Sequence, residues 1–435
     1  MPTLEFIDYV PHRAVVNGDT VSWVRDKAIK PINGLPQLFW SDGTPWREAN
    51  LWARERATPR EIKLKTVQDA MRHLHKYAAW LEETEQDWKH FPLEKAKRVL
   101  VRWRGELIAQ RGDGRLSPST ARERMASTIR FYRFAWVAGF IDKRSPIWQD
   151  KQVVLRYFDT VGLERTMGRI NADVSIPNVA RHGTILEDGL TPLSDKHKIE
   201  LLTFARDNCS PEINLMLALG FWTGARIGTI TDLKVANLVG ARQDPMMPGI
   251  YLVRCGPGSQ PYVRTKFDVK GELLLPAELR EDLLFYGFDQ RRKKRQAQAA
   301  PEHRDLLFLT RFGAPYAERE AYTSPSINQE MRSLRKAALA TGLHFMERFQ
   351  FHDTRATFGT WLMTLCLNEG SVNAALEFVR LAMFHKEVST TLRYIKFIEE
   401  NKNKAKYSDA FSRVFIGLRG RLNTQGVTQK VTAHA

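Results

Sequence analysis

Apolar residues at helical spacing dominate this chain from Pro59 onward, and this pattern most limits the folds that it can adopt. Val67, Met71 and Leu74 recur at steps of four and three, and later segments up to residue 148 repeat this spacing. A helix with that pattern carries one apolar face, which has to be buried against other helices. The stretch is therefore predicted to form a small domain of three or four helices, bounded by glycine and proline signals.

A second pattern, typical of β-strands, stands in the middle of the chain. Three short segments there have strand-like sequences, and a Gly-Pro-Gly turn separates the first two: residues 250–254, 262–266 and 272–276. A strongly apolar helix is predicted before them, at 214–223, and mostly helices are predicted after them, from 278 to about 418. The expected fold class is therefore mainly α with a small antiparallel β-sheet.

The 435 residues are enough for two or three domains. The first 58 residues combine tryptophans with turn-forming prolines and glycines and show no clear period, so an accessory domain or an extended arm is expected. Glycines and short β-like runs after the helical domain predict a linker, although a long one for a compact protein. The boundaries expected are an N-terminal segment at 1–58, the helical domain at 59–148, the linker at 149–190, a larger domain at 191–418 and a C-terminal tail at 419–435.

The chain carries a strong excess of positive charge. Lysine and arginine number 66, aspartate and glutamate 49, and the formal net charge is +17. Such a surface attracts polyanions, of which nucleic acid is the commonest inside a cell, although charge alone also fits a protein that is simply basic. The cations are spread along the chain, as expected for a protein that wraps its partner. Four arginines of the helical domain are candidates for contacts with DNA phosphates: Arg122, Arg124, Arg130 and Arg133.

Other features narrow the class of protein. No stretch of about 18 uninterrupted apolar residues occurs, so no membrane span is expected. The first residues lack the basic and apolar regions of a secretion signal, and three scattered cysteines suit a reducing compartment with neither a disulfide framework nor a zinc site. The expected location is the cytoplasm, in association with the nucleoid. A dense basic run at 291–295 is interpreted first as a solvated helix end, then as a phosphate contact and last as a localisation signal.

The last third of the chain carries two motifs that together suggest phosphate chemistry. His352-Asp-Thr-Arg355 is followed by His385, and Tyr394 lies nine residues after that histidine. Arg226 follows Thr-Gly-Ala at the end of the apolar helix. Negative charge grows on a phosphodiester as it becomes five-coordinate, and arginines are suited to hold its non-bridging oxygens because each planar fork binds two atoms at once. The histidines add donors whose protonation can follow the reaction.

A tyrosine among cations indicates covalent attack on the phosphodiester, because no acidic metal cluster accompanies it in the sequence. Its phenol is about three pKa units from ionisation at pH 7, which costs roughly 4 kcal/mol, and a positive pocket offsets much of this cost. The departing sugar hydroxyl needs a proton, and a lysine on a mobile hairpin tip is suited to donate it. Lys266 is predicted for this role, with Lys270 as the second candidate and Arg264 as a competing charge.

Each of these motifs alone also has an ordinary explanation. A His-x-x-Arg pair on a helix is usually structural, and Arg226 could simply cap the helix before it. Tyr394 could be a packed helix tyrosine, as the neighbouring Tyr407 illustrates. The joint order of the motifs along the chain favours the functional interpretation over these.

Taken in that order, the motifs resemble the tyrosine recombinases, the phage-integrase family. The resemblance covers about residues 190 to 410 well, and the helical segment from 59 to 145 resembles the core-binding domain of the family with weaker motifs. The motifs that carry it are Thr223-Gly-Ala-Arg226, Arg-Thr-Lys266, His352-Asp-Thr-Arg355, and His385 with Tyr394.

The resemblance implies a fold and a set of partners. The fold would be a two-domain, C-shaped clamp around double-stranded DNA, made of a helical core-binding domain and a catalytic domain. Protomers would act as a homotetramer on paired DNA sites, and accessory DNA-bending or mobile-element proteins are further expected partners. No membrane partner is expected.

The resemblance also assigns roles to individual side chains. The two arginines would hold the scissile phosphate with the help of the histidines, and the lysine would protonate the 5′-hydroxyl leaving group. The tyrosine would form a 3′-phosphotyrosyl link that conserves the bond energy, so that no metal, ATP or other cofactor is needed. The catalytic residues implied are Arg226, Lys266, His352, Arg355, His385 and Tyr394.

Two positions depart from the pattern of the family. Thr229 stands where an acidic residue usually supports the first arginine, with Asp232 as a candidate substitute, and Ala356 stands where a histidine or another polar residue often follows the second arginine. No reacting group is lost, so the expected protein is an active site-specific DNA recombinase of the integrase type. Two alternatives stay open: a transposase- or resolvase-like strand-transfer enzyme of the same chemistry, and a non-catalytic DNA-binding protein of the same fold.

Overall fold

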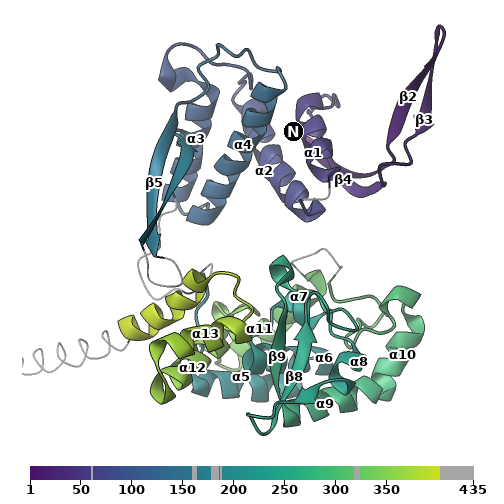
Figure 1. Ribbon diagram of the computed structural model, residues 1–435, viewed down its shortest axis with the longest axis vertical. Coiled ribbons are helices and arrows are strands. Elements are labelled where there is room, and N and C mark those ends of the chain that lie inside the picture. The colour runs from purple at the N-terminus through teal and green to yellow at the C-terminus, as the bar shows by residue number, and fades with distance from the viewer. Residues whose placement is uncertain (60–61, 159–163, 178–185, 187–188, 318–323, 402–435) are drawn as a thin grey trace, which may run out of the picture. The chain divides into compact units, whose positions relative to one another are not determined.

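The computed structural model describes residues 1–59, 62–158, 164–177, 186, 189–317 and 324–401. The chain divides into two compact units, Met1–Ala180 (unit 1) and Arg181–Ala435 (unit 2). Helices predominate and every sheet is small and antiparallel among the described residues, which confirms the predicted class of mainly α structure with little β (Figure 1). In these ranges no helix is both long and apolar enough to cross a membrane.

The helices of unit 1 surround an aromatic core. They are α1 (Arg47–Ala57), α2 (Leu64–Glu83), the short 3₁₀ turn η1 (Lys95–Lys97), α3 (Val99–Gly112) and α4 (Pro118–Val137). Tyr77 and Tyr132 are fully buried, their hydroxyl oxygens lie 2.7 Å apart, and Tyr132 donates to the carbonyl of Trp88. Helix α4 begins after Ser117, whose Oγ accepts the amide of Thr120. The helices predicted between residues 59 and 148 are therefore confirmed.

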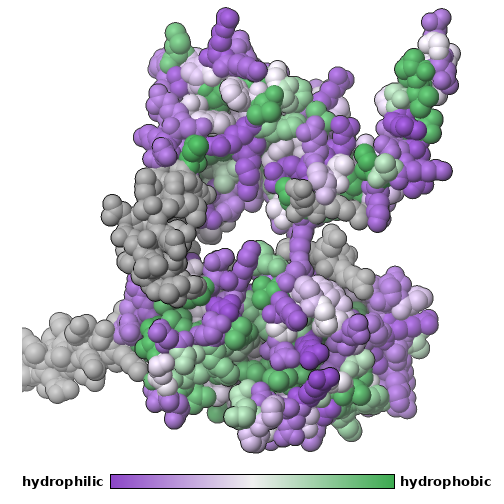
Figure 2. Space-filling model, in the orientation of Figure 1, coloured by the Kyte–Doolittle hydropathy of each residue, from purple (hydrophilic) through white to green (hydrophobic). Residues whose placement is uncertain are grey.

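The first 58 residues belong to unit 1 and combine helix α1 with a packed strand pair and an exposed hairpin. Leu35 and Leu38 of the packed pair are buried in the core that α1 and α2 line. The hairpin projects from the unit (Figure 1), and Figure 2 shows hydrophobic residues on it. Val16, Val21 and Trp23 of the hairpin are exposed. The packed pair is β1 (Thr3–Tyr9) with β4 (Ile32–Phe39), and the hairpin is β2 (His12–Asn17) with β3 (Thr20–Arg25).

The segment expected as a linker contains regular structure. β5 (Asp150–Phe158) and β6 (Glu164–Ala172) form an antiparallel hairpin in which Asp150 lies opposite Ala172. Val174 and Ile176, which follow the hairpin, are buried in the core of unit 1. Part of the segment 149–190 thus packs with unit 1.

Unit 2 places helices around a sheet with the strand order β7–β8–β9. The strands are β7 (Arg242–Gln243), β8 (Ile250–Cys255) and β9 (Gly271–Pro276). The helices before and among the strands are α5 (Asp195–Asn208), α6 (Pro211–Thr223), α7 (Ile227–Ile230), α8 (Val235–Val239) and the 3₁₀ turn η3 (Lys266–Asp268). Those after the sheet are α9 (Ala277–Phe288), α10 (Gln290–Gln298), η4 (Pro301–His303), α11 (Pro325–Ala340), η5 (His344–Glu347), α12 (Asp353–Glu369), α13 (Val372–Ala382) and helical residues 388–401.

The strand predicted at 262–266 is wrong. β8 pairs directly with β9, from Ile250 opposite Pro276 to Cys255 opposite Gly271, and residues 256–270 connect the two strands. The segment has the period of a strand because Val263 and Thr265 are buried between more exposed neighbours. Side chains bind much of its backbone where a neighbouring strand would have done so, and buried polar backbone groups need one or the other. Sequence periodicity does not distinguish these two cases.

The basic run at 291–295 is also different from its first interpretation. Arg292 and Arg295 are only 4% and 8% exposed, because residues three apart lie on one face of α10. Arg292 donates to the carbonyl of Leu306, and Arg295 donates to that of Leu309. Arg295 also pairs with the fully buried Glu212 at 3.0 Å. These arginines fasten α10 to its surroundings, so the interpretation as a solvated helix end is wrong for them.

Candidate active site

The segment that carries Arg226 starts where α6 ends. Gly224 ends this helix with a φ of +64°, a left-handed conformation that suits glycine, and its amide donates to Gly220 O. A Cβ on Gly224 would lie 2.4 Å from Cδ1 of Phe358, so α12 packs directly against this turn. Arg226 then stands as the residue before α7, half-buried, and its carbonyl accepts the amide of Ile230.

Helix α12 presents His352 and Arg355 from its first turn. His352 is the N-cap residue and is half-buried, and Arg355 lies three residues later, so both side chains emerge from the same side of the helix. The carboxylate of Asp353 accepts the amides of Gln350 at 2.7 Å and Thr191 at 3.1 Å. Burial raises the pKa of this carboxyl. Asp353 thus anchors the start of the helix, and with it the two motif residues.

Arg355 joins two distant segments of the chain. Arg355 is 1% exposed; its Nη1 donates to Gly224 O and its Nη2 donates to Met383 O, each at 2.6 Å. Gly224 lies two residues before Arg226, and Met383 lies two residues before His385. One guanidinium therefore holds together the turn after α6, which leads to Arg226, and the turn after α13, which leads to His385.

His385 and Tyr394 lie against each other and against α12. His385 is 2% exposed, and its Nδ1 lies 2.9 Å from Oγ1 of Thr391. Its ring stacks on that of Tyr394, with 5.9 Å between centroids and 29° between planes. Tyr394 is fully buried, and a Cβ on Gly359 would lie 2.5 Å from its Cε1. Gly359 is one helical turn beyond Arg355 on α12, so the phenol ring packs on the same face of that helix.

Lys266 belongs to the connection between β8 and β9, and this connection touches two parts of the site. Arg264 Nε donates to Gly228 O at 2.8 Å, two residues beyond Arg226. Gly271, at the other end of the connection, packs on Phe384, because a Cβ there would lie 2.3 Å from Cε1 of that ring. Phe384 directly precedes His385. The second candidate, Lys270, is part of the same connection and is exposed.

The two positions that depart from the family pattern have local roles. Thr229 Oγ1 donates to Arg264 O at 3.0 Å, and Asp232 accepts the amide of Arg264 at 2.7 Å. Asp232 also pairs with Lys234 at 3.1 Å. Ala356 is fully buried in the apolar cluster of α12 and α13. Both Thr229 and Asp232 therefore bind the connection that carries Lys266.

In unit 1, the predicted DNA-contacting arginines follow helix α4. Arg122 pairs with Glu123 at 2.7 Å, and Arg133 pairs with Asp150 at 3.0 Å. Arg130 donates to Ser127 Oγ at 3.0 Å. Burial lowers the pKa of the Arg124 guanidinium.

Two further groups lie beside these arginines, and no sequence motif indicates them. Burial, together with the charge of Arg124, lowers the pKa of His73, whose Nδ1 lies 2.9 Å from Ser127 Oγ. Burial and the charge of Arg130 lower the pKa of Arg56. Arg56 lies in the first 58 residues, where no clear period is visible in the sequence. The position of His73 off the apolar face of its helix is the one sequence feature that could have indicated a role for it.

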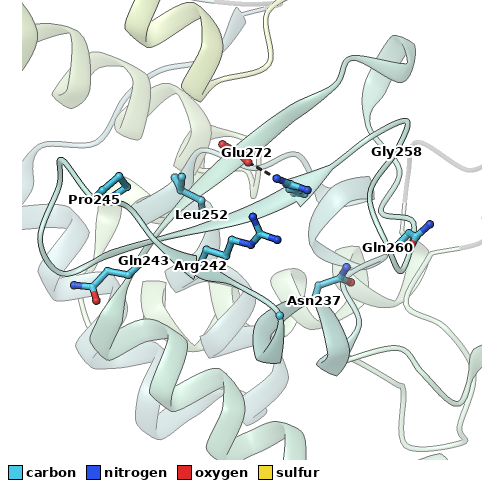
Figure 3. A pocket seen from close by; sticks show the side chains of 10 residues that line it. Asn237, Arg242, Gln243, Pro245, Leu252, Gly258, Gln260 and Glu272 are labelled. Carbon is cyan, nitrogen blue, oxygen red and sulfur yellow. Dashed lines mark hydrogen bonds and ion pairs between the residues drawn. The ribbon is translucent and has the colours of Figure 1, made fainter.

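A pocket beside the sheet adds another candidate for anion contact. The guanidinium of Arg242 and the side chains of Gln243 and Gln260 line it, while Arg254 on its wall pairs with Glu272 at 3.3 Å (Figure 3). None of these residues belongs to a motif that is recognisable in the sequence. Among the described residues, no group of three histidine, cysteine, aspartate or glutamate side chains is placed to hold a metal ion.

Comparisons with known proteins return solved structures only. No family model and no curated protein sequence matches the chain. The Tn1549 transposon integrase (residues 82–397) in complex with circular intermediate DNA is similar with a TM-score of 0.49 and 16% identity, over 80% of this chain and 93% of that one. A lambda integrase (75–356) dimer bound to a COC′ core site is similar with a TM-score of 0.45 and 14% identity, over 80% of this chain and 92% of that one. The catalytic domain of bacteriophage HP1 integrase is similar with a TM-score of 0.28 and 18% identity, over 48% of this chain and 88% of that one.

Proposed function

We propose that the protein is a tyrosine-type site-specific DNA recombinase that cuts and rejoins strands through a covalent 3′-phosphotyrosyl intermediate. The observation that carries this proposal is the position of Arg355. Its guanidinium binds the backbone of the segments that lead to Arg226 and His385, and it lies one helical turn from the glycine on which Tyr394 packs. A cationic, imidazole-rich site with a phenol at its edge is the assembly that metal-free attack on a phosphodiester needs.

Each side chain has a defined task in this reaction. Arg226 and Arg355 bind the non-bridging oxygens of the scissile phosphate, where negative charge increases in the five-coordinate state. His352 and His385 donate further hydrogen bonds to the same oxygens. The contact between His385 and Thr391 fixes the orientation of the imidazole, so little reorganisation is needed when charge develops.

The covalent step exchanges one phosphodiester for another. Tyr394 first loses its phenolic proton to solvent; the phenolate oxygen then attacks phosphorus, the bond to the 5′-oxygen breaks, and the Lys266 ammonium gives a proton to that oxygen. The 3′-phosphotyrosyl bond keeps the energy of the broken bond, so rejoining requires neither ATP nor another cofactor. Because Tyr394 is fully buried, helical residues 388–401 have to shift before the phenol reaches a duplex.

Double-stranded DNA is the proposed partner of both units. In unit 1, the face of α4 with Arg124 and Arg130 supplies cations for flanking phosphates, and in unit 2 Arg242 does the same beside the sheet. A formal charge of +17 supports this assignment. Strand exchange needs four cut strands, so a homotetramer on two paired sites, at the nucleoid in the cytoplasm, is the proposed working form. Accessory DNA-bending or mobile-element proteins belong to the same proposal.

A trapping experiment separates this function from its alternatives. The full chain is incubated in EDTA with a pool of nicked duplexes prepared from the DNA of its own cell, and denaturation-resistant protein–DNA adducts are collected and sequenced. Adducts at one recurring sequence support a site-specific recombinase, and adducts at one fixed end with scattered second sites indicate a transposase-like enzyme.

The matched substitutions in this experiment are Tyr394→Phe and Tyr407→Phe, which changes the next tyrosine along the chain. The adduct is expected to disappear with the first and to persist with the second. DNA binding without any adduct would refute catalysis and favour the non-catalytic protein of the same fold.

A further inference from the structure

A buried ion pair lies between α7 and α8, outside the residues assigned to the reaction. Asp232 Oδ1 and Lys234 Nζ are 3.1 Å apart, and their side chains are only 8% and 5% exposed. Burying two charges is costly unless further hydrogen bonds satisfy their remaining donors and acceptors. The partners that satisfy this pair therefore indicate what it holds in place.

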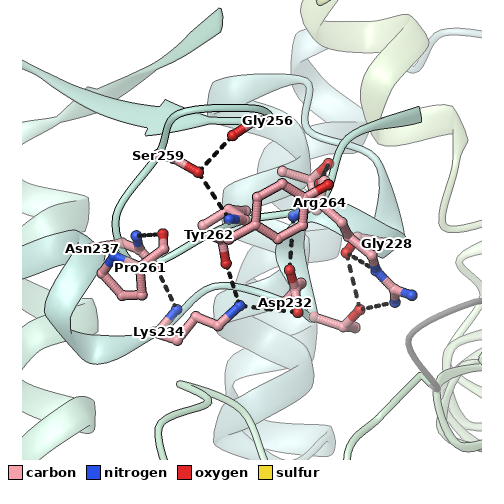
Figure 4. Close-up of polar contacts among 12 residues, drawn as sticks. Gly228, Asp232, Lys234, Asn237, Gly256, Ser259, Pro261, Tyr262 and Arg264 are labelled. Carbon is pink, nitrogen blue, oxygen red and sulfur yellow. Dashed lines mark hydrogen bonds and ion pairs between the residues drawn. The ribbon is translucent and has the colours of Figure 1, made fainter. Parts of the chain in front are cut away.

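Those partners all belong to the connection between β8 and β9 (Figure 4). Asp232 Oδ2 accepts the amide of Arg264 at 2.7 Å, and Lys234 Nζ donates to Tyr262 O at 2.5 Å. Asn237 also binds both sides of this contact: its Nδ2 donates to Pro261 O at 2.8 Å, and its Oδ1 accepts the amide of Lys234 at 2.9 Å. Three side chains between residues 232 and 237 thus bind three backbone groups between residues 261 and 264.

The other side of the connection is held in the same way. Ser259 Oγ accepts the amide of Val263 at 3.0 Å and donates to Gly256 O at 2.8 Å. Arg264 Nε donates to Gly228 O, and Thr229 Oγ1 donates to Arg264 O. Side chains therefore bind the backbone groups of residues 261–264 that a neighbouring strand would bind in a sheet.

The fixed backbone ends two residues before Lys266. Beyond it, Phe267 and Asp268 have left-handed φ values of 64° and 53°, and Phe267 is exposed. The ion pair thus holds the backbone that leads to Lys266. Tyr262 and Thr265 of this segment in turn donate to the tip of the connection, to Asp268 Oδ1 at 3.3 Å and to Val269 O at 2.7 Å. A displacement of about 1 Å at a reacting group costs on the order of 10²-fold in rate. The rigidity of the backbone at 261–264 consequently matters for proton transfer from Lys266.

We infer that the Asp232–Lys234 pair, with Asn237, positions Lys266 to protonate the departing 5′-oxygen. This inference rests on the proposed function and deepens it. Asp232, Lys234 and Asn237 are positioning residues that act through the backbone of residues 261–264. Asp232 therefore supports the proton donor of the site through Arg264 N.

A substrate with a sulfur atom in place of the bridging 5′-oxygen tests this directly. A thiolate leaves without a proton far more readily than an alkoxide, because a thiol has a pKa of about 8.5. Loss of a general acid slows cleavage of the oxygen linkage by about 10²- to 10⁴-fold. The same loss leaves cleavage of the sulfur linkage nearly unchanged. A merely structural defect slows both linkages alike.

The main variant is Asp232→Asn combined with Lys234→Met, which removes both buried charges together. We expect adduct formation on the oxygen linkage to fall by about 10²-fold and that on the sulfur linkage to stay within about threefold of wild type, as with Lys266→Ala. If this variant fails to fold, Asn237→Ala keeps the ion pair, releases Pro261 O and should give the same selective loss. Lys270→Ala is expected to leave both linkages unaffected.

Glu212→Gln is the matched control, because it breaks another buried ion pair of unit 2, with Arg291 and Arg295 on α10. It should change both linkages by the same factor. An equal loss on both linkages in the Asp232/Lys234 variant and in Asn237→Ala would overturn the inference while the proposed function stands. Wild-type protein that forms no adduct with either linkage would overturn the proposed function and this inference with it.

Discussion

Replacing Arg355 by lysine keeps the charge at the centre of the site and removes its planar fork. The arginine donates to Gly224 O and Met383 O at 2.6 Å each while only 1% exposed. A lysine ammonium is a compact charge on a flexible stem and cannot reach two carbonyls placed for a guanidinium. At least one buried carbonyl oxygen therefore loses its donor in Arg355→Lys.

The size of the effect follows from those two bonds. A hydrogen bond to a charged group contributes about 1.5–3 kcal/mol, so the free energy of unfolding of unit 2 should fall by about 1.5–3 kcal/mol. Loss of one preorganised donor to a developing anion costs about 10²–10³-fold in rate, so adduct formation should slow by that factor. DNA affinity should change little, because one phosphate contact is altered among many.

Urea denaturation of the full chain measures the first effect, and the time course of adduct formation on nicked duplex measures the second. Arg292→Lys is the control, since Arg292 is also buried and also binds several carbonyls, on α10. It should lose comparable stability and keep the wild-type adduct rate under conditions where it is folded. Arg355→Lys with wild-type stability, or with the wild-type adduct rate, would refute the role given to the guanidinium.

Other perturbations test separate parts of the structure. Gly359→Ala should lower the free energy of unfolding of unit 2 by about 1–3 kcal/mol, because the added methyl group overpacks against Tyr394. Gly105→Ala on α3 should not lower stability, because the methyl group there meets open space. A larger loss of stability for Gly105→Ala in thermal denaturation would contradict this packing. The pKa of His73 is lowered in the folded state, so the unfolded state binds the proton more readily, and stability should fall as pH drops below about 6.5. His73→Gln should remove that part of the pH dependence, and an unchanged profile in denaturation experiments would count against it. DNA affinity should fall steeply with salt, and Arg124→Ala should reduce the slope of log affinity against log salt concentration by about 1. Arg122→Ala should reduce it less, because Arg122 already pairs with Glu123. Equal slopes for the two variants in a fluorescence titration would remove Arg124 from the interface.

Local patterns were sufficient to predict helices α2, α3 and α4 of unit 1, whereas α1 lies in the first 58 residues, where no clear period indicated a helix. Val67, Met71 and Leu74 are all fully buried on α2, as their spacing requires, and Ser117 caps α4 where Ser-Pro indicated a start. Such features depend on neighbours in sequence, which periodicity reports directly.

Contacts between distant segments were not predictable in the same way. The bonds from Asp232 and Lys234 to residues 262–264 convert an expected strand into a connection, and the alternation of buried residues is the same in both. Arg292 and Arg295 appeared as part of a charged run, and only the position of Glu212 and of the 306–309 backbone explains their burial. For the proposed site, the type and order of the candidate reacting groups are visible in the sequence, whereas the contacts of Arg355 with Gly224 and Met383 required coordinates.

Mass spectrometry of the trapped adduct tests the central claim most directly. After nuclease and protease digestion, the proposal requires a nucleotide-modified peptide whose phosphate is attached to the phenol of Tyr394. A phosphate on any other residue, or a DNA-bound protein from which no modified peptide is ever recovered, would contradict a phosphotyrosyl intermediate at this site.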